Sequence, residues 1–306
     1  MTSLPVHDSI LFERLFYAVD NSKRGILMIR IIVDSSSDYQ LEELKQKNME
    51  LVPISITMGD QSYLDGIDLN RDDFYKMLTE TTDFPKTSQP STQSFLDIFL
   101  DAKEKGDDCI CILLSSGLSG TYQGACLARN LADYDNIYII DSLAAICIIQ
   151  VLAERACALR EQGYNASDIV SEVEKLKSRV KLVAALDTLE YLRRGGRLSK
   201  TAATIGELAN LKPMITITEE GTIGVIGKSL GRNKAISGLI KHVKENELDL
   251  SYPVYSLYTF GTDNSEIFEE KLANEDIYPT ARLQVGPTIG THIGPNAFGI
   301  MYVIKE

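Results

Sequence analysis

From residue 28 onward, short apolar runs typical of strands alternate with longer stretches that have helical periodicity. The clearest apolar run, Ile110-Cys111-Ile112-Leu113-Leu114, has no polar residue at alternate positions. A strand of this composition is buried on both faces, as in a parallel sheet covered by helices. The sequence therefore predicts an α/β fold whose first half is a parallel sheet between two layers of helices.

The pattern changes near residue 181, where we expect a second domain to begin. Residues 214–218 and 222–228 flank Glu219-Glu220-Gly221, which is typical of a β-hairpin. We expect an α/β/α domain over residues 28–180 and an α/β domain with a mixed or antiparallel sheet over residues 181–306. Residues 1–27 continue neither pattern, and we interpret them as an N-terminal extension that is not native or has a functional role of its own.

Composition argues against several classes of protein. The chain has 31 Lys and Arg against 43 Asp and Glu, and the formal net charge of −12 opposes nucleic-acid binding. No signal peptide or membrane-length apolar run is evident, so we expect a cytoplasmic protein without stable membrane insertion. The five cysteines form no C-x-x-C pair and no histidine lies at metal-ligand spacing, so we expect reduced thiols and no metal site.

Two loops rich in hydroxyl groups suggest a binding site for an acid. Residues 86–91 include Thr87 and Ser88, and residues 114–121 include Ser119 and Gly120. Each loop leads into a stretch with helical periodicity, where hydroxyls and free backbone N–H groups can hold a carboxylate. The alternative is that these hydroxyls only cap the helices.

Known catalytic motifs are missing around these loops. The chain has no G-x-S-x-G elbow around Ser119, no P-loop, and no G-x-G-x-x-G after its first strand. His292, in a glycine-rich segment over residues 286–296 that we interpret as a loop, is the one histidine that could serve the site. A hydrolase or acyltransferase that uses Ser119 and His292 remains the alternative to a binding protein.

Five motifs together carry a resemblance to a known family. They are, in order, Val33-Asp34-Ser35-Ser36-Ser37-Asp38, the two hydroxyl loops, Arg193-Arg194-Gly195-Gly196-Arg197-Leu198-Ser199, and Ile289-Gly290-Thr291-His292-Ile293-Gly294-Pro295. With these motifs the chain resembles the DegV family from about residue 28 to its end. The resemblance implies a two-domain lipid-binding protein that is not itself an enzyme and needs no cofactor.

The resemblance also assigns the parts of the site. It implies a long-chain fatty acid such as palmitate or oleate between the domains, with its carboxylate on Thr87 and Ser119. His292 is expected beside the carboxylate, and Ser88 and Gly120 belong to the same two ligand-binding motifs.

A kinase partner is a further implication of the resemblance. In DegV-like proteins that serve fatty-acid kinases, a separate ATP-binding subunit phosphorylates the bound acid. Arg197 and Arg232 belong to two basic groups in an otherwise acidic chain. Because arginine suits phosphate contacts, we expect both to face that partner or the transferred phosphate.

Overall fold

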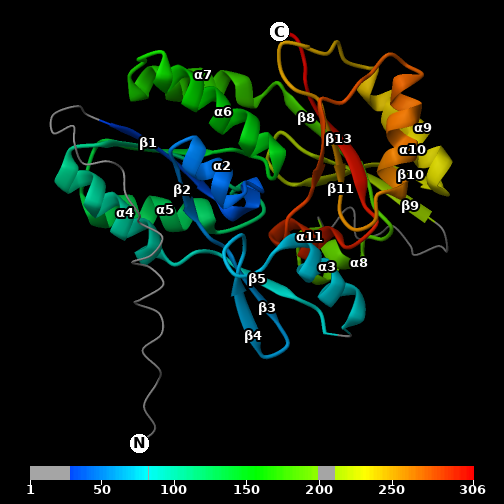
Figure 1. Ribbon diagram of the computed structural model, residues 1–306, viewed down its shortest axis with the longest axis horizontal. Coiled ribbons are helices and arrows are strands. Elements are labelled where there is room, and N and C mark those ends of the chain that lie inside the picture. The colour runs from blue at the N-terminus through cyan, green and yellow to red at the C-terminus, as the bar shows by residue number, and fades with distance from the viewer. Residues whose placement is uncertain (1–27, 82, 199–210) are drawn as a thin grey trace, which may run out of the picture.

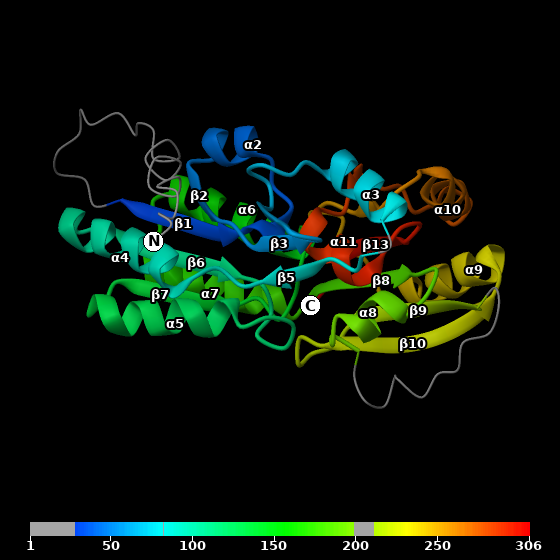
Figure 2. The ribbon, with the colours of Figure 1, turned by 90° about the horizontal axis from the view of Figure 1, so that it is seen from below.

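The computed structural model describes residues 28–81, 83–198 and 211–306, which form two α/β domains (Figure 1). The expected extension, residues 1–27, lies outside the described residues. Figure 2 shows the two domains at opposite ends of the long axis, with α11 (Pro287–Ile293), β3 (Ser55–Met58) and β5 (Lys86–Ser88) between them.

The first domain contains a four-stranded parallel sheet in the order β2-β1-β6-β7. Its strands are β1 (Ile29–Asp34), β2 (Met49–Val52), β6 (Asp108–Leu113) and β7 (Ile137–Asp141). A short 3-10 helix, η1 (Ser35–Ser37), follows β1. The predicted parallel sheet is therefore confirmed.

Helices cover both faces of this sheet, as the uninterrupted apolar strands predict. Ile110 and Ile112 pack into a core cluster with α2 (Leu41–Gln46), α6 (Cys147–Glu161) and α7 (Ala166–Lys177). Cys109, Cys111 and Leu113 point the other way and pack against α4 (Thr92–Lys105) and α5 (Thr121–Ala132). Successive residues of β6 thus enter two different cores, which explains why the run has no polar positions.

The second domain is built on a six-stranded mixed sheet in the order β10-β9-β8-β13-β11-β12. Its strands are β8 (Val180–Ala185), β9 (Leu211–Ile217), β10 (Ile223–Leu230), β11 (Tyr255–Tyr258), β12 (Ala281–Gln284) and β13 (Phe298–Val303). Among the strand pairs that the structure describes in this sheet, only β11 and β12 are parallel. The predicted β9–β10 hairpin is confirmed, and Gly221 in its turn has φ 72°, which a residue without a side chain adopts easily.

The two faces of the second sheet have different partners. Val183, Phe298 and Ile300 pack on the outer side against α9 (Arg232–Val243) and α10 (Asp263–Ala273). Leu182 and Met301, one position away in sequence from these residues, belong to the cluster that continues into the first domain. The inner face therefore looks toward the first domain.

A small antiparallel sheet in the order β4-β3-β5 lies between the domains, with β4 at Gln61–Leu64. The sequence pattern of residues 50–57 predicts a single strand, but the structure divides this run between β2 and β3. Pro53 has no N–H to donate to the sheet, and the N–H of Ile54 donates to Ser35 Oγ at 2.9 Å. Beside this sheet lie α3 (Arg71–Glu80), α8 (Glu190–Arg194) and α11.

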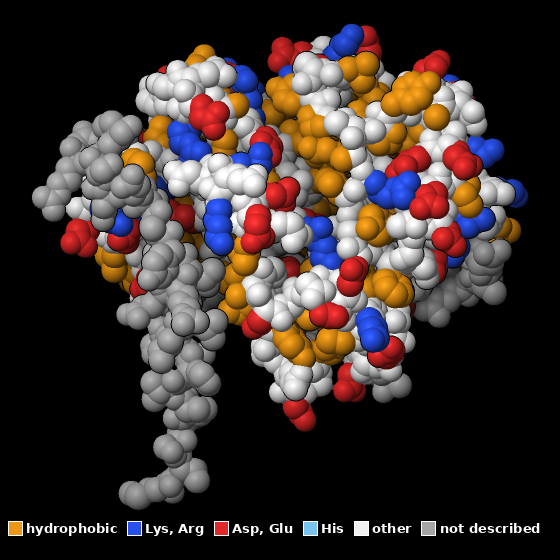
Figure 3. Space-filling model, in the orientation of Figure 1, with side chains coloured by type: hydrophobic (Ala, Val, Ile, Leu, Met, Phe, Trp, Pro, Cys, Tyr) orange, Lys and Arg blue, Asp and Glu red, His pale blue; other side chains and the backbone are white. Residues whose placement is uncertain are grey.

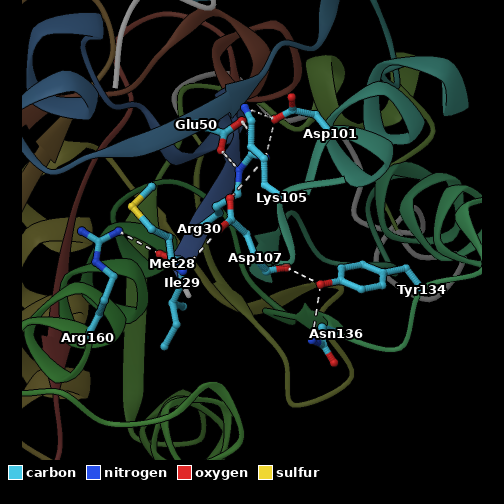
Figure 4. A network of polar contacts seen from close by, with 10 residues as sticks. All are labelled: Met28, Ile29, Arg30, Glu50, Asp101, Lys105, Asp107, Tyr134, Asn136 and Arg160. Carbon is cyan, nitrogen blue, oxygen red and sulfur yellow. Dashed lines mark hydrogen bonds and ion pairs between the residues drawn. The ribbon is translucent and has the colours of Figure 1, made fainter. Parts of the chain in front are cut away.

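A polar network around Arg30 fixes the amino-terminal ends of β1 and β2 against α4 (Figure 4). Arg30 in β1 donates to both carboxylate oxygens of Glu50 in β2, at 2.5 and 2.9 Å, and to Asp101 in α4 at 2.7 Å. Its side chain is only 9% exposed. Such a bidentate pair holds β1, β2 and α4 in place.

Candidate ligand-binding site

A cavity lies between the inner face of the second sheet and the first domain. The space inside it, including the solvent-filled opening, is about 910 Å³. Aliphatic side chains make up most of the wall: Ile54, Leu114, Leu118, Ala145, Ile146, Leu182, Ala184, Leu192, Ile215, Ile217, Ile223, Leu257, Val285, Ile289, Ile293 and Ala297.

The first domain contributes loops from the carboxyl ends of its strands. Ile54 follows β2, Leu114 follows β6, and Ile146 follows β7. The chain order of the sheet reverses between β1 and β6, and ligands of α/β folds bind at such a switch point. The cavity therefore occupies the place where an α/β sheet offers a site.

The Val33–Asp38 motif positions these loops. Asp34 Oδ2 accepts a hydrogen bond from the N–H of Leu114 at 2.6 Å. Ser35 Oγ accepts from the N–H of Ile54, and the carbonyl of Ser36 accepts from the N–H of Ile146 at 2.8 Å. The three donors all belong to cavity-lining residues, so the motif supports the wall of the cavity without lining it.

The sequence pattern of residues 143–162 predicts one long helix, but α6 begins only at Cys147. Leu143 and Ile146 have φ values of 51° and 53°, which do not fit a right-handed helix. The hydrogen bond from the N–H of Ile146 to the carbonyl of Ser36 holds this segment against the cavity instead.

Polar side chains interrupt the apolar wall of the cavity, and we call the part around Thr87 and His292 its polar part. Thr87, Ser119 and His292 all line the cavity, and Thr87 Oγ1 lies 2.8 Å from His292 Nε2. Ser119 Oγ lies 2.9 Å from Thr121 Oγ1. The structure thus brings together three of the residues that the sequence predicts for the site.

Thr87 occupies a strand, β5, and not a loop at a helix start as expected. β5 pairs with β3, with Thr87 opposite Ile56. Successive strand residues point to opposite sides, and accordingly Ser88 is exposed and is not among the cavity-lining residues. The side chain that caps α4 is Ser91, whose Oγ accepts from the N–H of Ser94 at 3.1 Å.

Gly120 also lies outside the lining, but it shapes the site. A Cβ at this position would be 1.9 Å from Gln89 Oε1. The missing side chain lets Gln89 pack over the start of α5 and line the cavity. Our sequence interpretation missed Gln89, although it stands in the same Thr-Ser-Gln-Pro motif as Thr87.

The expected glycine-rich loop around His292 is a helix, α11. Pro287 occupies its first turn, where the missing N–H costs nothing. Asp65 accepts hydrogen bonds from both the N–H and the hydroxyl of Thr288. Gly294, with φ 73°, ends the helix directly after the turn that carries His292.

His292 is neutral in this environment. Its side chain is buried, at 8% exposure. Burial lowers the pKa of His292 from 6.5 to about 4, and the charge of Arg197 contributes in the same direction. Within the described residues its Nδ1 has no hydrogen-bond partner, and Gly195 lies so close that a Cβ there would be 2.2 Å from this atom.

The two arginines expected to face a partner occupy different places. Arg197 lines the cavity and donates from Nε to the carbonyl of Leu118 at 2.9 Å, and burial lowers its pKa. Arg232 is exposed at the start of α9 and contacts Asn264 Oδ1 at 3.3 Å. The structure therefore puts a cation in the polar part of the cavity that the charge pattern alone did not locate.

Other features of the described residues bear on the remaining expectations. None of the helices there is both long and apolar enough to cross a membrane. All five cysteines are free thiols. No group of three or more potential ligand side chains in this part of the chain is placed to hold a metal ion. On the face shown in Figure 3, Lys and Arg side chains are interspersed with Asp and Glu.

Comparisons with known proteins agree with this architecture. A family model described as "Uncharacterised protein, DegV family" matches residues 28–305. A DegV domain-containing protein of Caldanaerobacter subterraneus subsp. tengcongensis is 36% identical over 281 residues, which are 90% of this chain and 99% of that protein.

Solved structures are similar over nearly the same range. A DegV family protein from Thermus thermophilus, described as binding fatty acid, is 26% identical with a TM-score of 0.81, covering 91% of this chain and 100% of that one. A stearic acid-binding protein from Eubacterium ventriosum is 26% identical with a TM-score of 0.80, covering 91% and 99%. With the match to the family model and the 36% identical relative, these findings show that the chain belongs to the DegV family.

Proposed function

We propose that this protein binds one long-chain fatty acid, such as palmitate or oleate, in the cavity between its domains. The carboxylate lies at the polar part of the wall, on the hydroxyls of Thr87 and Ser119 and beside His292. Ser88 and Gly120 flank these contacts. The observation that carries the proposal is the contact between Thr87 and His292 in the wall of a mostly aliphatic cavity.

The tail supplies most of the binding free energy. Burial of about 14 methylene groups contributes about 11 kcal/mol before the entropic costs of association. The carboxylate must give up water, so it needs donors and a counter-charge. Thr87 and Ser119 are hydroxyl donors, and Arg197 is a cation in the same wall.

The geometry favours binding over hydrolysis. A serine hydrolase needs its nucleophile within hydrogen-bond reach of a histidine that a third group orients. Here the hydroxyl within hydrogen-bond distance of His292 Nε2 is that of Thr87, whereas Ser119 Oγ contacts Thr121. Family relatives described as fatty-acid-binding proteins support the same choice.

The experiment is denaturing extraction of the purified protein followed by mass spectrometry of the lipid. Wild-type protein should release about one fatty acid per chain, and a Thr87→Ala, Ser119→Ala double variant should release much less. Ser171→Ala, which removes an exposed hydroxyl on α7, is the matched control and should behave as wild type. A wild type that carries no acid and fails to take up added palmitate or oleate would refute the proposal.

The bound acid is presented in the cytoplasm to the ATP-binding subunit of a fatty-acid kinase. A carboxylate oxygen forms a bond to the γ-phosphorus of ATP, the bond from that phosphorus to the bridging oxygen breaks, and ADP leaves. Arg197 neutralises charge at the carboxylate, and Arg232, exposed on α9, contacts the kinase.

Charge reversal tests the kinase step separately from binding. Arg232→Glu should slow acyl-phosphate formation with a purified kinase while fatty-acid affinity stays unchanged. Lys241→Glu, also exposed on α9, is the control for a general charge effect. Equal rates for wild type and Arg232→Glu would remove Arg232 from the kinase interface.

A further inference from the structure

Four cavity-lining residues from four adjacent strands lie in one row across the second sheet. Ala184 of β8 is in register with Ile215 of β9 on one side and with Gly299 of β13 on the other. Gly299 is in turn in register with Leu257 of β11. Residues in register on neighbouring strands project from the same face, and all four line the cavity.

The residues of this row are small in the middle and branched at the ends. A Cβ on Gly299 would lie 2.7 Å from the Cβ of Ala184 and 2.5 Å from the carbonyl oxygen of Val183. The centre is therefore a shallow trench between Ile215 and Leu257. With strands about 4.8 Å apart, the row spans about 14 Å from β9 to β11.

Arg197 and the loop that carries Ser119 lie near the β9–β10 end of the row. Leu198, which directly follows Arg197, forms a β-bridge with Ile223 of β10. A hydrogen bond joins the loop that carries Ser119 to the β9–β10 turn, because Ser115 Oγ donates to the carbonyl of Gly221 at 2.7 Å. A carboxylate held by these groups has its tail directed along the row toward β11.

The wall at the β11 end is held by buried hydrogen bonds. The N–H of Val285 donates to the carbonyl of Tyr258 in β11 at 2.8 Å, and the hydroxyl of Tyr75 donates to the carbonyl of Val285 at 2.9 Å. The backbone N–H of Thr288 donates a hydrogen bond to the carboxylate of Asp65. Both Val285 and Thr288 line the cavity, so this wall does not recede without breaking buried bonds.

We propose that this row measures the length of the acyl chain. The tail crosses the sheet over Ala184 and Gly299, and Leu257 stops its terminal methyl group. Leu257 is thus the residue that sets the chain-length limit, and Ala184 keeps the trench open. This inference rests on the proposed function.

Two substitutions should shift the chain-length limit in opposite directions. Leu257→Ala removes the stop, so arachidate should gain about tenfold in affinity relative to palmitate. Ala184→Leu fills the trench, so palmitate and stearate should lose about tenfold or more relative to laurate. Leu272→Ala truncates a leucine of α10, which packs on the other face of the sheet. It should lower the stability of the protein without changing the order of its affinities for these acids.

The measurement is competition among laurate, myristate, palmitate, stearate and arachidate for delipidated protein, read by mass spectrometry of the bound acid. Leu257→Ala provides an independent reading if Ala184→Leu does not fold. Wild-type binding with the same ranking in Leu257→Ala would overturn the ruler and leave the proposed function intact. No binding of any acid by wild type would overturn the proposed function and the ruler with it.

Discussion

Thr87 Oγ1 lies 2.8 Å from His292 Nε2, although 205 positions separate the two residues in sequence. Thr87 comes from β5, in the small sheet between the domains, and His292 from α11, near the end of the chain. Their contact joins distant parts of the chain at the polar part of the cavity. The site therefore exists only when α11 is packed against β5.

Replacement of Thr87 by valine should weaken ligand binding. Valine keeps the branched shape but removes the hydroxyl, and a hydrogen bond to a charged group contributes about 1.5–3 kcal/mol, so affinity for palmitate should fall by about tenfold or more. Titration calorimetry on delipidated protein measures the change. Thr87→Ser keeps the hydroxyl and should stay close to wild type, whereas equal affinity for Thr87→Val would exclude Thr87 as a ligand contact.

His292 should make the unliganded protein less stable in acid. The pKa of His292 is about 4 in the folded protein and near its usual 6.5 when unfolded. Between these values the unfolded chain binds a proton that the folded chain does not, so stability falls as pH drops from 6.5 to 4. The full difference is about 3 kcal/mol.

Urea unfolding of wild type and His292→Gln at several pH values isolates this effect. Buried Asp38 and Asp65 have raised pKa values, about 7 and about 6, and so act in the opposite direction, but both proteins share them. The variant should therefore lose less stability than wild type over this range. Parallel stability curves would show that His292 does not titrate as described.

Gly195→Ala should disturb the site mainly through His292. Gly195 has an ordinary helical φ of −71°, so alanine meets no backbone strain, but its Cβ would lie 2.2 Å from His292 Nδ1. The imidazole must move away from Thr87, and fatty-acid affinity should fall by about tenfold. Gly124→Ala in α5 is the control, because the nearest atom, Gln89 Nε2, is 3.5 Å from the new Cβ. Unchanged binding in Gly195→Ala would show that the imidazole position is unimportant.

Arg30→Met should lower stability without changing ligand preference. The substitution leaves Glu50 without its bidentate partner and leaves Asp101 paired with Lys105 alone (Figure 4). Because Arg30 is nearly buried and its partners are partly exposed, we expect a loss of about 2–3 kcal/mol in urea unfolding. Lys105→Met breaks an exposed ion pair with the same Asp101 and should cost at most about 1 kcal/mol. Similar losses in both variants would contradict this difference.

The sequence by itself determined the elements that depend on local pattern. The apolar run at residues 110–114 indicated a strand buried on both faces, and the turn at Gly221 indicated a hairpin; the structure contains both. These features follow from side-chain periodicity and turn chemistry, which act over a few residues. The motifs likewise singled out Thr87, Ser119 and His292 as residues of one site.

Only the tertiary structure decided how those parts meet. It divided the run 50–57 between two sheets, placed His292 on a helix, and turned Arg197 into the cavity. It also aligned Ile215, Ala184, Gly299 and Leu257 in one row, although no two of them are neighbours in sequence. Strand register and domain packing depend on contacts between residues far apart in the chain, and local sequence patterns do not encode them.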